Sequence, residues 1–251
     1  MSTPDIQLTP SLMHMPSHEQ KEHVVQLYTD DSSLIDVLSP FIGGALTLGD
    51  PAVVIATKSH HTELAKRLSS LGFDTAGAAM QGRYVILDAT ETLPKVMVNG
   101  AVDETRFNDI IGGVLTKVRS AVDGKAQRVT VFGELVALLW AEGKPEQAIK
   151  IEQLWNDLAT VHSLSLLCAY PIMGFNNDRH FKPFLKMCCE HSGVVPSESY
   201  LGLGSEEERL RSIAQLQQKA QALEKELALR QSEERFRVFV EAVQDLSLIH
   251  I

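Results

Sequence analysis

Polar side chains that directly follow short apolar runs are the residues in this sequence best placed to do chemistry. Glu134 follows Val129–Phe132, a run that predicts a buried strand, with only Gly133 between them. A carboxylate in that position costs free energy unless it is paired or hydrogen-bonded, which makes Glu134 the sharpest candidate for a ligand contact. Its alternative role is an acid at the start of the following helix, where the helix dipole favours negative charge. The predicted ligand-binding residues, drawn from the strand ends and their surroundings, are Tyr28, Thr57, His60, Asp88, Glu134, Trp155 and Tyr170.

Several of these candidates also have a structural interpretation. Asp88 can cap the helix that follows its strand. His60 and His61 stand at a helix start, where a solvated pair is the ordinary arrangement and a pocket position for one of them is the alternative. Trp155 and Trp140 could wall an apolar ligand cavity, but tryptophans at helical spacing commonly pack in a core. The sequence leaves these alternatives open.

The three cysteines do not form a catalytic or metal-binding motif. Cys168 lies in an apolar run, where a thiol is hard to ionise, and the chain has no GxSxG motif for a serine nucleophile. Cys188 and Cys189 are adjacent and form no CxxC pair, which suits reduced thiols better than a disulfide framework. Together with His191 they could ligate a metal, but the usual second ligand pair is absent, which favours a buried or half-buried helix end. We therefore predict no catalytic residue, no metal site and no cofactor.

The scaffold that positions these residues is predicted by short, near-continuous apolar runs. Such strands, separated by amphipathic helices, imply an α/β fold with a mainly parallel sheet covered by helices on both faces. In an open sheet of this kind, ligands bind in the crevice outside the carboxyl ends of the strands. The predicted strands are Val24–Tyr28, Ala52–Thr57, Tyr84–Asp88, Val129–Phe132 and Leu164–Ala169.

The helices follow from capping residues and apolar stripes. A helix is expected from Asp30 onward, and because Pro40 lies in its stripe we expect it to kink there or to begin later. Ser59–Gly72 predicts a helix that ends on a glycine. Asp103 can cap the next helix. The apolar stripe of that helix is Phe107, Ile111, Val114, Val118 and Val122.

Composition restricts the class of protein further. The chain has 251 residues, of which 44% are hydrophobic and 22% charged, as in a soluble globular protein with one sizeable domain and an appendage. A net charge of −9 without a basic cluster argues against nucleic-acid binding, which needs a basic face. The longest apolar run, 41–57, is broken by glycine, aspartate and proline, so no membrane span is expected. The N-terminal tail, residues 1–17, has no export signal, which favours the cytoplasm.

A different kind of sequence begins at Ser205. Residues 205–234 are charged and rich in Ala, Leu and Gln, and their apolar positions alternate at spacings of 3 and 4, as in the seam of a coiled coil. We expect a homodimer through this seam; a single amphipathic helix that docks on the domain is the alternative. The seam residues are Ile213, Leu216, Ala220, Leu223 and Leu227.

The last residues resemble a further domain and then a foreign sequence. The stretch RQSEERFRVFVEAVQD, which includes residues 235–245, resembles the linker and first helix that open a PAS sensor domain. One back-translation of the final LSLIHI, residues 246–251, matches the start of a transposase adapter used in sequencing libraries. We expect this hexapeptide to be adapter read-through and the natural protein to continue into the PAS domain. If the encoding DNA uses other codons for these six residues, they are not adapter read-through.

Three motifs in the second half of the chain resemble the MEDS domain, a prokaryotic sensory domain named for methanogens, methylotrophs and a dichloromethane-responsive regulator. They are GELVALLWAEG (Gly133–Gly143), IEQLWNDLA (Ile151–Ala159) and LSLLCAYP (Leu164–Pro171). Earlier segments such as HVVQLY (His23–Tyr28) fit as well, and the resemblance covers residues 18–200. It implies a fold related to RecA-like and KaiC-like P-loop proteins and the sensing of hydrocarbon derivatives. It also implies attachment to PAS and histidine kinase modules of two-component systems.

The phosphate cradle of a P-loop protein is not recognisable here. A RecA-like ATPase needs a glycine-rich loop after its first strand, with Lys for the phosphates and Ser or Thr for magnesium. The turn Tyr28–Asp36, YTDDSSLID, has neither glycine nor lysine, and Asp30 and Asp31 place negative charge where an anion would bind. We interpret the fold as a degenerate P-loop fold and the nucleotide site as lost.

The leading functional interpretation is a cytoplasmic input module that senses a small organic compound. It would signal through the coiled coil to downstream PAS and kinase domains of the same chain. One alternative is an ATP-binding KaiC-like switch or ATPase with an altered nucleotide site, and another is a protein-interaction domain without a small ligand. The sequence contains no phosphoacceptor histidine box and no kinase ATP site, so no enzymatic activity is predicted for it.

Overall fold

The computed structural model describes residues 22–122, 128–172 and 181–197. They belong to the first of two compact units, Met1–Leu201, and the second unit is Gly202–Ile251. The N-terminal tail, the coiled coil predicted for 205–234, the PAS segment 235–245 and the hexapeptide 246–251 lie outside the described residues.

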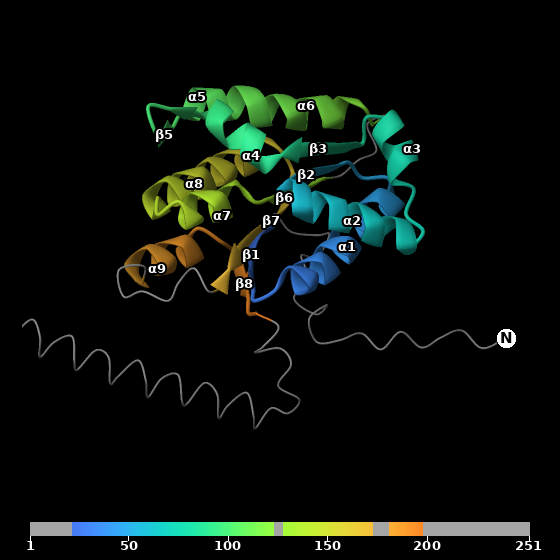
Figure 1. Ribbon diagram of the computed structural model, residues 1–251. Helices are drawn as coiled ribbons and strands as arrows, with labels where there is room; N and C mark the ends of the chain where they lie inside the picture. Colours follow the sequence, from blue (N-terminus) through green and yellow to red (C-terminus); the bar gives the residue numbers. More distant parts are fainter. Residues whose placement is uncertain (1–21, 123–127, 173–180, 198–251) are drawn as a thin grey trace, which may run out of the picture. The chain divides into compact units, whose positions relative to one another are not determined.

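A six-stranded parallel sheet forms the centre of the first unit, with the strand order β3-β2-β6-β7-β1-β8 (Figure 1). The neighbouring strands β2 and β6 are buried along their whole length because both faces of the sheet are covered. The predicted α/β class, with a mainly parallel sheet, is confirmed. The strands are β1 (Glu22–Tyr28), β2 (Ala52–Ala56), β3 (Tyr84–Asp88), β6 (Val129–Gly133), β7 (Leu164–Pro171) and β8 (Gly193–Val195).

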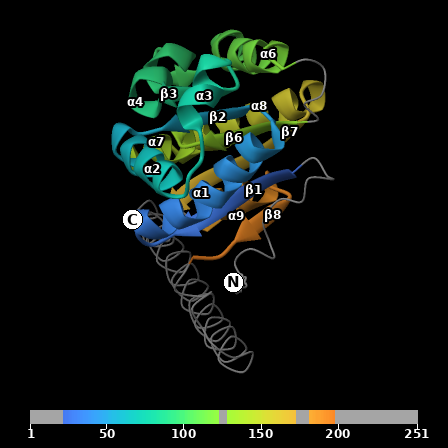
Figure 2. The ribbon, with the colours of Figure 1, turned by 90° about the vertical axis from the view of Figure 1, so that its right-hand side faces the viewer.

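Helices cover both faces of this sheet (Figures 1 and 2). A separate apolar cluster packs against each face. One face packs against α1 (Asp31–Leu48), α2 (Lys58–Ser70) and α3 (Thr75–Met80). All the later helices pack on the other face, where a small antiparallel hairpin of β4 (Met97–Val98) and β5 (Ala101–Val102) also forms. These helices are α4 (Ala89–Thr92), η2 (Leu93–Val96), α5 (Glu104–Phe107), η3 (Asn108–Gly112), α6 (Gly113–Ser120), α7 (Leu135–Ala141), α8 (Pro145–Val161) and α9 (Phe181–Cys189). None of the helices in the described ranges is long and apolar enough to cross a membrane.

Helix α1 begins where its capping residue predicts. The Asp30 carboxylate accepts a hydrogen bond from the Ser33 amide at 3.0 Å, which satisfies one of the free N–H groups of the first turn. The helix then continues through Pro40 to Leu48, so the later start that Pro40 suggested is wrong. Gly49 ends the helix in the left-handed conformation, with φ of 85°.

The segment after Asp103 is helical but not uniformly so. Asp103 caps α5 as predicted, and a π-helical turn, η3, separates α5 from α6. Phe107, Ile111 and Val118 are buried as expected, but Leu115 is buried in place of the predicted Val114. A π turn contains one extra residue, which rotates the following helix and changes the residues that face the core.

Candidate functional site

The carboxyl ends of β2 and β6 form a topological switch point. These neighbouring strands continue into helices on opposite faces of the sheet, α2 after β2 and α7 after β6. Crevices at such points are the usual ligand sites of open parallel sheets. Thr57 directly follows β2 and Glu134 directly follows β6, so two of the predicted residues flank this position.

Glu134 bridges the two strand ends with its side chain. One carboxylate oxygen, Oε2, accepts a hydrogen bond from the Thr57 amide at 2.7 Å, and the other, Oε1, lies 2.6 Å from Nδ1 of His60. Glu134 stands at the N-cap position of α7, but its side chain makes no capping hydrogen bond there. With only 3% of its surface exposed, the carboxylate is held by its partners across the switch point, as a buried charge requires.

His60 lies between two carboxylates that come from different elements. Its Nδ1 faces Glu134, and its Nε2 lies 3.2 Å from Oδ1 of Asp31 at the start of α1. The hydrogen bond to Glu134 raises the pKa of His60 to about 8, although burial opposes the shift. The ring of Tyr28 stands edge-on at a centroid distance of 6.3 Å, and burial together with the charges of Glu134 and Asp31 raises the pKa of its phenol. Four predicted residues, Tyr28, Thr57, His60 and Glu134, therefore meet in one network.

An open groove of about 520 Å³ lies next to this network, between α1 and α2. His60 and Asp31 line it, and so do Arg67 and Asp36, which form an ion pair with each other. The Asp31 side chain is 70% exposed, so its carboxylate is accessible to a small molecule in the groove. Ile35 is the apolar residue of the lining, and the other lining residues are polar or charged, although the carbon atoms of their side chains form most of the groove's surface. The site can therefore hold a small molecule through hydrogen bonds and charge.

The titration of His60 gives this network a measurable pH dependence. Because its pKa in the folded protein is raised from 6.5 to about 8, protonated His60 stabilises the fold. That contribution is complete below the unfolded value and is lost as the pH rises through about 8. We therefore expect His60→Gln to be destabilised relative to wild type by more below pH 6.5 than above pH 8. The destabilisation at low pH should exceed that at high pH by at most about 2 kcal/mol.

Urea denaturation of wild type and His60→Gln across this pH range tests the expectation. His61→Gln, which changes a histidine of the same helix, is the matched control and should follow the wild-type curve. A stability difference between wild type and His60→Gln that does not change with pH would contradict the assignment of the shift to His60.

Asp88 lies apart from this network. Its carboxylate accepts hydrogen bonds from the amides of Thr90 at 2.8 Å and Glu91 at 3.1 Å, so it caps α4 at the end of the edge strand β3. The side-chain hydrogen bond from Thr90 and the bond from the Glu91 amide lower the pKa of Asp88. The structure thus gives Asp88 the capping role that the sequence allowed.

Both tryptophans pack in the core beneath the sheet. Trp155 is fully buried and meets the Phe107 ring edge-to-face at a centroid distance of 5.3 Å. Trp140 meets the Tyr170 ring in the same way at 5.7 Å. Neither tryptophan lines the groove between α1 and α2.

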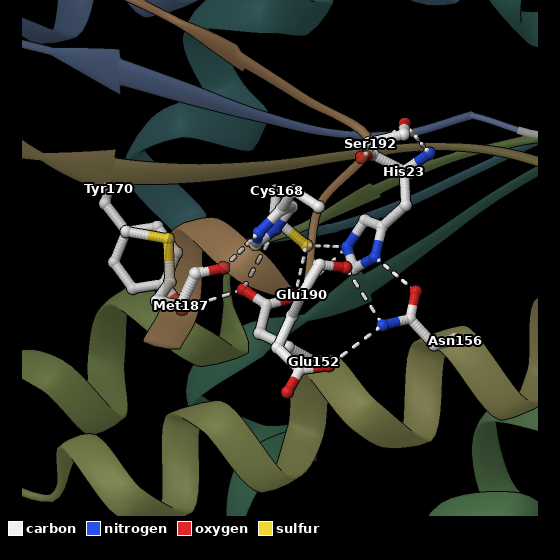
Figure 3. A network of polar contacts seen from close by, with 9 residues as sticks. His23, Glu152, Asn156, Cys168, Tyr170, Met187, Glu190 and Ser192 are labelled. Carbon is white, nitrogen blue, oxygen red and sulfur yellow. Dashed lines mark hydrogen bonds and ion pairs between the residues drawn. The ribbon is translucent and has the colours of Figure 1, made fainter. Parts of the chain in front are cut away.

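Tyr170 belongs to a second polar cluster, which the sequence did not predict. Its hydroxyl donates a hydrogen bond to Oε1 of Glu152 at 2.7 Å, and Glu152 is completely buried on α8 (Figure 3). Four side chains of this cluster could together hold a metal ion, because one ligand atom from each lies within 4.8 Å of all the others. They are His23, Glu152, Cys168 and His191. The signals in the sequence were Glu152, an acid among the apolar residues of a helix, and His191, which was considered as a metal ligand together with Cys188 and Cys189.

Three comparisons with known proteins bear on this chain. A family model described as the methanogen/methylotroph, DcmR sensory domain (MEDS) matches residues 22–181. No curated protein matches the chain. Among solved structures, it is similar to a KaiC-like protein of the hyperthermophilic archaeon Pyrococcus horikoshii. The two are 16% identical, and the match covers 70% of this chain and 71% of the archaeal one with a TM-score of 0.43.

Proposed function

The chain belongs to the MEDS family of sensory domains, and from that premise we propose that it recognises a small organic compound in the groove between α1 and α2. The observation that carries the proposal is His60, held between Glu134 and Asp31 at the switch point and facing the groove. In this proposal the domain is the sensory input of a signalling protein and performs no catalysis itself.

The lining of the groove favours a ligand with a polar group over a bare hydrocarbon. The exposed Asp31 carboxylate offers a hydrogen-bond acceptor to an amine or hydroxyl of the ligand, whereas the Lys66 and Arg67 side chains of the lining are already paired with Glu63 and Asp36. Ile35 gives a small apolar contact for an alkyl part. A hydrocarbon derivative that carries one polar substituent fits this surface better than the unsubstituted compound.

A ligand can signal only if it binds one arrangement of the domain more tightly than another. The network joins α1 through Asp31, α2 through His60, and the start of α7 through Glu134, so it connects helices on both faces of the sheet. A ligand that competes with His60 for Asp31 would change contacts in both layers. We propose that the output passes through a coiled-coil homodimer at 205–234 to PAS and histidine kinase domains of the same cytoplasmic chain.

A nucleotide is a less favourable ligand for this domain. The Asp30 carboxylate already accepts from the Ser33 amide and from the hydroxyls of Ser32 and Ser33 at the start of α1. A phosphate bound there would compete with this carboxylate for the same donors and would be repelled by its charge and that of Asp31. Magnesium-ATP is therefore the control ligand in the test of the proposal.

The test is calorimetric titration of the chain with short alcohols, amines and halogenated or methylated compounds. We expect at least one polar derivative to bind and Asp31→Asn to weaken it by about 10-fold, because a hydrogen bond to a charged group is lost. Asp109→Asn, which removes an exposed carboxylate on η3, should leave the affinity unchanged. Binding of magnesium-ATP instead, or equal affinities for the two variants, would refute the proposed site.

A further inference from the structure

We propose that His23, Glu152, Cys168 and His191 form a closed four-ligand Zn²⁺ site on the face of the sheet opposite the groove. The four side chains come from β1, α8, β7 and the turn between α9 and β8. Glu152 and Cys168 are fully buried, His23 is 6% exposed, and the side chain of His191 is fully buried. Figure 3 shows three of the ligands, His23, Glu152 and Cys168, with their side chains pointing toward one another.

The ligand atoms lie nearly as close together as those around a tetrahedral zinc ion, with one atom from each residue within 4.8 Å of all the others. Nε2 of His23 lies 3.4 Å from Sγ of Cys168 and 3.1 Å from Oε2 of Glu152. Sγ of Cys168 lies 3.2 Å from the same carboxylate oxygen, and Nε2 of His191 lies 3.4 Å from Oε1. Zinc bonds to N, O and S in a tetrahedron place the ligand atoms about 3.3–3.6 Å apart. Two histidines, a thiolate and a carboxylate are all common zinc ligands.

The orientation of His23 is fixed by contacts on its outer side. Its Nδ1 lies 2.8 Å from Oδ1 of Asn156, and the Asn156 amide nitrogen faces the backbone and carboxylate oxygens of Glu190, which can only accept. Oδ1 of Asn156 is therefore the acceptor, and Nδ1 of His23 must carry the proton. In the neutral ring, the lone pair is then on Nε2, which points at Cys168 and Glu152.

His191 is fixed in the same way. Its Nδ1 lies 2.7 Å from the carbonyl oxygen of Met187, which can only accept, so this nitrogen carries a proton. Its Nε2 is buried and has no hydrogen-bond partner in the part of the chain that the structure describes, although Oε1 of Glu152 lies 3.4 Å away. An outer hydrogen bond that leaves Nε2 bare toward a shared centre is the usual arrangement of a metal-binding histidine.

The charges of the cluster are compatible with a dication at this centre. Without a cation, Nε2 of His23 can accept a hydrogen bond from the Cys168 thiol, and a protonated His191 can form an ion pair with Glu152. That arrangement has only a weak thiol donor and one buried ion pair in place of four metal bonds. Zn²⁺ with the Cys168 thiolate, the Glu152 carboxylate and two neutral imidazoles has no net charge.

The surroundings complete the site. The hydroxyl of Tyr170 donates to Oε1 of Glu152, which leaves Oε2 to bind the ion. A surface groove of about 390 Å³ reaches His23 and His191 and gives the ion a route in. Four protein ligands leave no open position for substrate, so the ion would be structural. It would hold the turn between α9 and β8 against β1, β7 and α8.

Metal analysis of the whole chain tests this site directly. After chelation and reconstitution, we expect about one zinc ion per chain, with release by a strong chelator and a lower melting temperature of the apo-protein. Cobalt substitution should give the near-ultraviolet absorption band of a thiolate–cobalt bond. Wild-type protein that binds no zinc, or a cobalt form without that band, would overturn the proposal whatever the variants do.

Two serine variants locate the ion. Cys168→Ser should lower the zinc affinity by about 100-fold or more and abolish the cobalt band. Cys189→Ser changes an exposed thiol of α9 that lies beside His191 in the surface groove, and it should keep both. Loss of zinc in Cys189→Ser with retention in Cys168→Ser would instead indicate binding on the surface and would refute the buried site.

Discussion

Replacement of Trp155 by alanine is expected to lower the free energy of unfolding by about 3–5 kcal/mol, because it removes a fully buried indole and leaves a cavity that the sheet cannot close. The ring contacts Phe107 on one side and approaches the Gly133 backbone on the other, so the site is lined by both helix and strand. For a domain of this size, the change corresponds to a fall in melting temperature of about 10 °C. Urea denaturation and a thermal scan measure it.

Trp155→Phe is the matched comparison, since phenylalanine keeps an aromatic ring in contact with Phe107. We expect a loss of about 1–2 kcal/mol for this variant. Its affinity for a ligand of the α1–α2 groove should equal that of wild type, because Trp155 does not line the groove. If Trp155→Ala were as stable as wild type, the core position of Trp155 would be contradicted. If Trp155→Phe kept its stability and lost only ligand binding, Trp155 would instead be a wall of the ligand cavity.

The strands could be predicted because of how a parallel sheet is built. A strand that is covered on both faces is apolar at every position, and β2, with all five residues buried, gives that signal without ambiguity. β8 was not predicted because Gly193–Val195 is a run of only three residues at the edge of the sheet. So short a run has no periodicity from which to recognise a strand.

The sequence predicted Glu134 as a candidate but could not predict its partners. The requirement that a buried carboxylate be hydrogen-bonded comes from local sequence alone. The identity of the partners depends on β2 and β6 being neighbours, and Thr57 and His60 are 77 and 74 residues away along the chain. Asp88 shows the opposite case, because its partners Thr90 and Glu91 are local and the capping role could be foreseen.

The Glu152 cluster shows where prediction from motifs fails. Local spacing suggested Cys188, Cys189 and His191 as the possible metal ligands, and of these only His191 belongs to the cluster. His23 and Cys168 are 145 residues apart and meet only because β1 and β7 are neighbours in the sheet. A ligand set drawn from four separate elements leaves no spacing pattern in the sequence.

Replacement of Glu134 by alanine is expected to lower the free energy of unfolding by about 3 kcal/mol, because each hydrogen bond to a buried carboxylate contributes about 1.5–3 kcal/mol and the donors are left without their partner. The Thr57 amide and Nδ1 of His60 are these donors. Glu134→Gln should cost less, since the amide keeps the shape of the side chain and one acceptor oxygen. Glu142→Ala, which removes an exposed glutamate at the other end of α7, should change stability by less than about 0.5 kcal/mol.

The same variant separates a structural role of Glu134 from a role in sensing. The hydrogen bond to Glu134 is the largest cause of the raised His60 pKa, so an NMR titration should show that pKa falling from about 8 in Glu134→Ala. Nε2 of His60 can still donate to the Asp31 carboxylate, but the link from the groove through Glu134 to α7 would be lost. Ligand binding to Asp31 should then persist without changing the stability of α7, as measured by hydrogen exchange. If Glu134→Ala were as stable as Glu142→Ala, or if ligand still protected α7 in it, the bridge across β2 and β6 would not be the element that couples the groove to the rest of the domain.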